Sequence, residues 1–116
     1  VVHSICMDRL GRLWVADREN CRVKVFDTKG NLLAVAEGNL SRIGTVFADE
    51  TYLYAAELDG GVTLIGLDTL EVAAQLGVPG DGVFKAHGIC ADDKGNLYLA
   101  TNKANENNLI RLTRIE

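Results

Sequence analysis

Cysteine is scarce in this 116-residue sequence, and the three cysteines stand far apart from one another. Their number is odd and no two of them form a CxxC pair, so the sequence supports neither a disulfide framework nor a cysteine-based zinc site. We expect Cys6 and Cys90 to be small buried residues of strands, whereas Cys21 falls in a turn.

The sequence also lacks a basic stripe and a long apolar run. The net charge is −4 and the Lys and Arg residues are scattered, which argues against a nucleic-acid partner. The apolar stretches are interrupted within a few residues, so no segment predicts a membrane-spanning helix and we expect no membrane partner. Hydrophobic residues make up 47% of the chain, which is ordinary for one globular domain.

We find no signal-peptide pattern in the residues given, and the first of them is Val rather than Met. Because the chain begins inside a strand-like pattern, we expect it to be a fragment or a trimmed chain. The residues given therefore leave the compartment of the protein open.

A repeat of about 40 residues runs through the whole chain. The segment "HSICMDRLGRLWVADRENCRVKVFD" aligns with "GTVFADETYLYAAELDGGVTLIGLD" and with "HGICADDKGNLYLATNKANENNLIRLT". The three segments begin at His3, Gly44 and His87. An aromatic residue that we expect in the core occupies one shared position: Trp14, Tyr54 and Tyr98.

Each repeat consists of short runs that read as β-strands, separated by turns rich in Gly and Asn. The expected strands are 2–7, 12–16, 21–27 and 32–38; then 43–48, 52–56, 62–67 and 71–76; then 86–91, 96–100 and 108–113. The third repeat has no fourth strand. This pattern predicts an all-β fold, a β-propeller arc of three four-stranded blades with the last blade incomplete, over residues 1–38, 39–78 and 79–116.

Three blades do not close a ring, since propellers typically have about four to eight. An open arc would expose the apolar faces of its end blades, at a cost of about 25 cal/mol per Å². We therefore predict half of a six-bladed ring. The ring would be completed either by a missing propeller half or by a second copy of this chain.

The stretches "GRLWVADRENCRVKVFDTKGNLL" and "KGNLYLATNKANENNLIRL" resemble NHL repeats, which build six-bladed propellers. A narrower resemblance rests on His-Ser followed by Asp-Arg-Glu-Asn, which is similar to the peptidyl-α-hydroxyglycine α-amidating lyases. It implies zinc as cofactor, His3 and His87 as metal ligands, and Arg18 as a catalytic residue. It also implies a secreted, zinc-dependent lyase, or a fragment of one, that cleaves peptidyl-α-hydroxyglycine to a peptide amide and glyoxylate.

The propeller fold gives the same residues a shared position. The first strand of each blade lines the channel, so His3 and His87 belong to alternate blades at one end of it. A third His from another blade would complete a set of three imidazole ligands. Three such ligands on a zinc ion whose fourth coordination position is open are a catalytic zinc arrangement. In the role that the resemblance implies, the planar charge of Arg18 would hold an anionic group, such as a substrate carboxylate or a phenolate base.

The sequence departs from the lyase pattern in three ways. The third His and the catalytic Tyr of that family are not among these residues. Calcium is less well supported than zinc, because Gly88 stands where the family has an acidic calcium ligand.

Other interpretations of the same residues stay open. The two histidines could be solvated residues of the channel, and Arg18 could be a surface cation paired with Glu19 or Asp17. The chain could then be a non-catalytic NHL propeller module that binds a protein or a small ligand. We also align Asp17, Glu57 and Asn102, and we expect them to bind backbone amides of loops.

Overall fold

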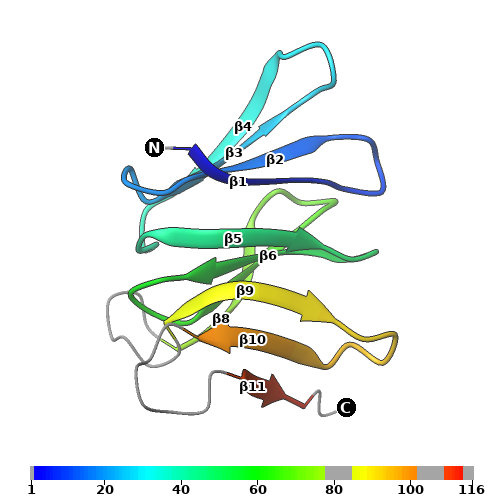
Figure 1. The fold of residues 1–116 in the computed structure, drawn as a ribbon. Helices are drawn as coiled ribbons and strands as arrows, with labels where there is room; N and C mark the ends of the chain where they lie inside the picture. Colours follow the sequence, from blue (N-terminus) through cyan, green and yellow to red (C-terminus); the bar gives the residue numbers. More distant parts are fainter. Residues whose placement is uncertain (1, 78–84, 102–108, 114–116) are drawn as a thin grey trace.

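The protein forms three antiparallel β-sheets, and the sequence-based prediction of an all-β propeller arc is confirmed (Figure 1). The structure, a computed structural model, describes residues 2–77, 85–101 and 109–113. Sheet 1 contains β1 (Val2–Met7), β2 (Leu13–Asp17), β3 (Arg22–Phe26) and β4 (Leu32–Glu37). Sheet 2 contains β5 (Ile43–Ala48), β6 (Tyr52–Glu57), β7 (Val62–Gly66) and β8 (Val72–Leu76). Sheet 3 contains β9 (Ala86–Ala91), β10 (Leu97–Thr101) and β11 (Leu109–Leu112).

The strands lie within one or two residues of their predicted positions, and the turns explain the differences. The strand expected over 21–27 is β3, because Cys21 has a φ of 52° and belongs to the preceding turn. Asp27 leaves the strand to accept bonds from the amides of Lys29 and Asn31, each at 2.9 Å.

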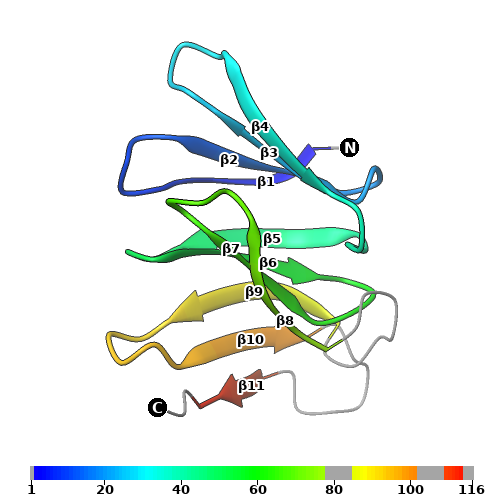
Figure 2. The ribbon, with the colours of Figure 1, turned by 180° about the vertical axis from the view of Figure 1, so that it is seen from behind.

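The sheets stack on one another through two cores. The inner strands β1, β5 and β9 lie side by side (Figure 1). Seen from behind in Figure 2, β7 and β8 lie in front of β5 and β6. One core lies between sheets 1 and 2 and includes Trp14, Val25, Leu53 and Ile65. The other lies between sheets 2 and 3, so sheet 2 is covered on both faces.

An aspartate at the end of each inner strand anchors the aromatic residue of the same repeat. The Nε1 of Trp14 donates to Asp8 at 2.7 Å, and the hydroxyl of Tyr98 donates to Asp92 at 2.9 Å. Tyr54 makes the equivalent bond to Asp49. Trp14 and Tyr54 are buried, as expected of core residues, and Tyr98 is half-buried.

Two arginines of the β1–β2 turn reach across to sheet 2. Arg12 donates to the carbonyl of Leu67 at 2.6 Å and to the buried carboxylate of Asp8 at 2.8 Å. Arg9 donates to the carbonyl of Glu50 at 2.6 Å and pairs with Asp68 at 2.9 Å, but its bonds lie on the exposed surface.

The expected burial of the two strand cysteines is wrong for Cys90, which is exposed. Cys90 lies on the face of sheet 3 turned away from sheet 2, and no described sheet packs against that face. Cys6 is half-buried against the first core, and this burial raises the pKa of its thiol to about 11. In the part of the chain that the structure describes, no helix has the length and apolarity of a membrane span.

Candidate functional site

A β-bulge in each inner strand places one residue of every repeat at the same end of the arc. The pairing with the neighbouring strand skips from Val2 to Ser4 in β1, and it makes the same skip around Gly44 in β5 and His87 in β9. A bulge turns the skipped residue out of the regular alternation of a strand. His3, Gly44 and His87 therefore occupy equivalent positions, as the sequence alignment predicted.

These bulges bring the two histidines of the chain together. The imidazole rings of His3 and His87 have centroids 5.1 Å apart and planes inclined at 80°. The Nδ1 of His3 lies 2.6 Å from the carbonyl oxygen of Gly44. A carbonyl can only accept, so this hydrogen bond requires the proton on Nδ1, and in the neutral ring the free lone pair is then on Nε2.

Gly44 fits this place because it has no side chain. A Cβ there would lie 2.9 Å from the carbonyl oxygen of Ala86 and 2.9 Å from the Cδ2 of Leu58. The absence of a Cβ therefore lets β9, which carries His87, approach β5 closely.

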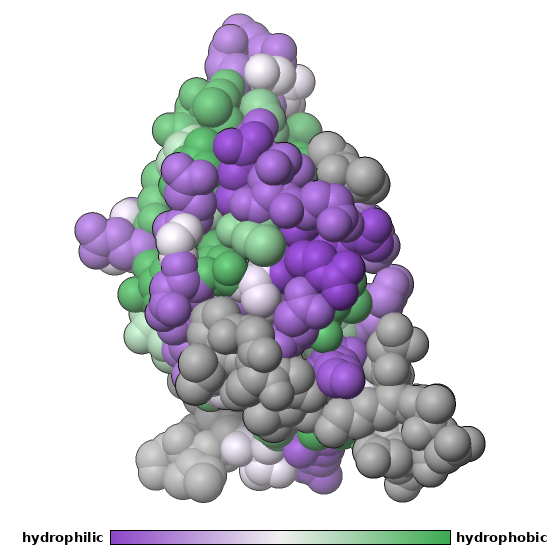
Figure 3. Space-filling model, turned by 90° about the vertical axis from the view of Figure 1, so that its left-hand side faces the viewer, coloured by the Kyte–Doolittle hydropathy of each residue, from purple (hydrophilic) through white to green (hydrophobic). Residues whose placement is uncertain are grey.

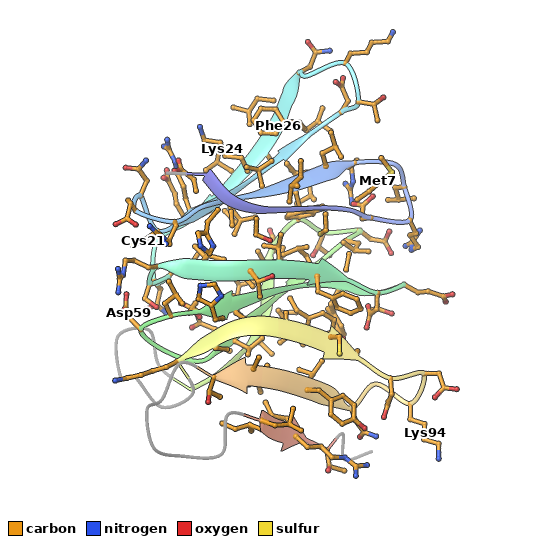
Figure 4. The ribbon with its side chains drawn as sticks, viewed as in Figure 1. Met7, Cys21, Lys24, Phe26, Asp59 and Lys94 are labelled. Atoms are coloured by element: carbon orange, nitrogen blue, oxygen red, sulfur yellow. The ribbon has the colours of Figure 1, made fainter. Side chains whose placement is uncertain are left out.

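A pocket of about 370 Å³ lies at this end of the arc. In Figure 4 the labelled residues Cys21 and Asp59 mark this end, and Met7 and Lys94 mark the opposite one. Figure 3 faces the same end and shows hydrophilic side chains gathered across it. The residues that line the pocket come from all three repeats: Arg18, Arg42, Leu58, Asp59, Lys85 and His87.

The structure thus brings Arg18 to the same pocket as His87. Arg18 follows β2 in sheet 1, whereas His87 lies in β9 of sheet 3. The Nε of Arg18 also pairs with Glu19 at 2.6 Å, which is the surface pairing that the sequence left open. The guanidinium therefore borders the pocket with one donor already engaged.

Two of the residues that line this pocket, Arg42 and Asp59, form an ion pair with each other. The Nε and Nη2 of Arg42 donate to the two carboxylate oxygens of Asp59 at 2.7 and 2.8 Å. These hydrogen bonds hold the pKa of Asp59 below its usual value, and the charge of Lys85 acts in the same direction. The hydrogen bonds with Asp59 likewise raise the pKa of Arg42.

Sequence reasoning missed Arg42 and Lys85. Each stands directly before an inner strand, Arg42 before β5 and Lys85 before β9. The repeat register already placed the starts of these strands beside the two histidines. The residues in front of them could therefore have been included in the candidate site.

The alignment of three polar residues needs a correction. Asp17 is the last residue of β2 and Glu57 is the last residue of β6, and each pairs with the residue that precedes the bulge in the neighbouring inner strand. In sheet 3 the equivalent residue is Thr101 and not Asn102. Asn102 lies outside the described residues. Glu57 accepts a bond from the amide of Ser41 at 2.7 Å, as expected. Asp17 accepts bonds from the side chains of Asn20 and Arg22.

A larger hollow of about 860 Å³ lies at the opposite end and is lined largely by turn residues. Its aspartates, Asp49 and Asp92, already accept bonds from turn amides and from tyrosines. We attribute a structural role to them. Within residues 2–77, 85–101 and 109–113, no group of three or more His, Cys, Asp or Glu could hold a metal ion.

The fold and the bulged inner strands define a β-propeller arc, and sequence comparison shows which proteins it is similar to. Residues 2–26 match the NHL repeat. The chain is similar to NHL repeat-containing protein 3 of Homo sapiens, with 34% identity over 41% of this chain and 21% of the relative. It is 33% identical to the protein of the same name from Mus musculus, over the same shares. These matches support the NHL-repeat family, and the aligned part of the chain spans about a fifth of the length of these relatives.

Proposed function

We propose that this chain is part of a zinc-dependent lyase that cleaves peptidyl-α-hydroxyglycine to a peptide amide and glyoxylate. One observation carries the proposal: the bulges of β1 and β9 bring His3 and His87 into ring contact. The resemblance of the His-Ser and Asp-Arg-Glu-Asn segments to the α-amidating lyases supplies the reaction.

The spacing of the two histidine rings supports the proposal of a shared zinc ion. Two imidazoles on one tetrahedral zinc, with Zn–N bonds of about 2.05 Å, have ring centroids about 5 Å apart. The observed separation is 5.1 Å. The bond from Nδ1 of His3 to the Gly44 carbonyl is the kind of outer contact that orients a ligating imidazole and leaves Nε2 for the metal.

Each residue then has a distinct part in the proposed reaction. When bound, zinc supplies a Lewis acid that favours loss of the proton of the substrate hydroxyl. His3 and His87 would hold the metal, and the Gly44 carbonyl would fix the ring of His3. Arg18, on the wall of the same pocket, would hold negative charge on the substrate carboxylate or on the base that accepts the proton. The third ligand and that base would come from another part of the protein.

Zinc titration of the purified chain tests this proposal. His3 and His87 are the only two histidines of the chain, so a loss of zinc affinity in His3→Ala or His87→Ala can be assigned to the replaced imidazole. Each variant should bind zinc at least about tenfold more weakly, because the loss of a residue that only hydrogen-bonds to a zinc ligand already lowers zinc affinity by about that much. The double variant Cys21→Ser/Cys90→Ser should bind zinc like the wild type.

The outcomes separate this proposal from a non-catalytic propeller module. If both histidine variants keep the zinc affinity of the wild type, the zinc site and the lyase assignment are wrong. If they lose zinc, Arg18→Ala in the longer protein should abolish cleavage of peptidyl-α-hydroxyglycine while its zinc content stays unchanged. Full cleavage by that variant would refute the role of Arg18.

A further inference from the structure

The inner strands β1 and β5 lie side by side but belong to different sheets (Figure 1). Each is the end strand of its sheet, so one of its edges carries backbone N–H and C=O groups that the strands of its own sheet do not bind. The hydrogen bonds that join β1 to β5 are therefore made by side chains.

Two consecutive side chains of β1 make these bonds. The Nδ1 of His3 donates to the carbonyl of Gly44 at 2.6 Å. The hydroxyl oxygen of Ser4 accepts a bond from the amide of Val46 at 3.2 Å, and it lies 3.3 Å from the hydroxyl oxygen of Thr45. The Ser4 hydroxyl thus attaches β1 to β5 at a second point, next to the imidazole.

The ring of His3 needs this second point because the residue lies in a bulge. A bulged residue leaves the regular strand ladder, and its side chain can still turn about two bonds. Ser4 is the residue at which the pairing of β1 with β2 resumes, opposite Ala16. It is therefore held by β2 through its backbone and by β5 through its hydroxyl, and it fixes the backbone that carries the ring of His3.

The hydroxyl contact lies beside His3 and has no counterpart beside His87. The residue that follows the bulge is Ser4 in β1 and Gly88 in β9. Because Gly88 has no side chain, it cannot attach β9 to a neighbouring strand through a hydroxyl. His87 can therefore serve as an internal reference for His3.

We propose that Ser4 is a positioning residue for His3. Its hydroxyl holds the bulge of β1 on β5, so that Nδ1 keeps its bond to the Gly44 carbonyl and Nε2 stays available to a metal ion. The consequence for metal binding rests on the proposed zinc function, whereas the effect on the imidazole belongs to the metal-free chain. Ser4 acts through His3 and has no part in binding substrate.

Long-range ¹H–¹⁵N NMR of the chain, stripped of metal on a chelating resin, tests this role in alkaline solution, where imidazoles are neutral. The wild type should show His3 with its proton on Nδ1. In Ser4→Ala the ratio of the Nδ1–H to the Nε2–H form of His3 should fall several-fold, and that of His87 should stay unchanged. Ser4→Thr keeps the hydroxyl and should retain the wild-type ratio.

Zinc titration of the same variants measures the consequence for the metal. Ser4→Ala should bind zinc about tenfold more weakly, the scale expected of a residue that orients a zinc ligand, and Ser4→Thr should bind like the wild type. Ser41→Ala is the matched control, because it removes a hydroxyl that donates to Glu57 at 3.1 Å, away from β1. It should change neither the His3 ratio nor the zinc affinity.

Each outcome has a definite meaning. A wild-type His3 with its proton on Nε2, an unchanged ratio in Ser4→Ala, or an equal change in Ser41→Ala would overturn the positioning role. A fall of the ratio in Ser4→Thr would show that the hydroxyl is not what holds the ring. If the wild type binds no zinc but Ser4→Ala shifts the ratio, the lyase proposal fails and the positioning of His3 is supported.

Discussion

The imidazole of His3 lies edge-on against the imidazole of His87, with 5.1 Å between the ring centroids, although the two residues come from the first and third sheets. Gly44 lies in the middle sheet, and its carbonyl oxygen accepts a hydrogen bond from Nδ1 of His3. The contact depends on three equivalent bulges and on the close stacking of three inner strands.

Replacing Gly44 by Ala should disturb this stacking. The new Cβ would meet the Ala86 carbonyl and Leu58 at 2.9 Å, so β5 and β9 must move apart. We expect the free energy of unfolding in urea to fall by about 1–3 kcal/mol, the usual cost of overpacking. Gly88→Ala is the matched control, because its Cβ would make only an ordinary contact at 3.5 Å with Ala100. Equal effects of the two substitutions would contradict this account.

Removing Arg12 should cost more stability than removing Arg9, although both arginines join sheet 1 to sheet 2. Arg12→Ala leaves the buried carboxylate of Asp8 without its cation and the Leu67 carbonyl without its donor. We expect a loss of about 1–3 kcal/mol. Arg9 bonds on the exposed surface, so Arg9→Ala should cost about 0–1 kcal/mol. Urea unfolding of both variants measures the difference, and a larger loss for Arg9→Ala would refute the assignment.

Acid should weaken the fold partly through Asp92. The hydrogen bond from the Asn96 side chain, with those from turn amides and Tyr98, lowers the pKa of Asp92 from 3.8 to about 2. A carboxyl whose pKa is lower in the folded state stabilises the fold above its unfolded pKa, and this contribution is lost as pH falls from about 4 through about 2.

The variant Asp92→Asn should therefore show a shallower decrease in the free energy of unfolding between pH 4 and pH 2. Asp93→Asn changes the neighbouring exposed residue, whose side chain takes no part in the Asp92 turn bonds, and should behave like the wild type. Unfolding curves at a series of pH values measure both. An unchanged pH slope in Asp92→Asn would show that this turn does not contribute to acid stability.

Much of the fold could be predicted because its signals are local. Alternation of apolar and polar residues, with Gly and Asn in the turns, placed β5 and β9 at their observed bounds. The aligned aromatic residues fixed the repeat, and their positions in β2, β6 and β10 follow from it. Strand ends were less predictable, as at Cys21, because backbone conformation decides them.

The sequence by itself determined the strands, the repeat and the common position of His3, Gly44 and His87, since each depends on a periodicity carried along the chain. Only the tertiary structure decided which side chains of different repeats meet. Arg42 and Lys85 join Arg18 in one pocket, and Cys90 is exposed on an outer face, because the sheets stack in a particular order and leave particular faces uncovered. The repeat register indicates which residues lie at the same end of the arc, but which side chains meet there depends on how sheets that are far apart in the chain stack.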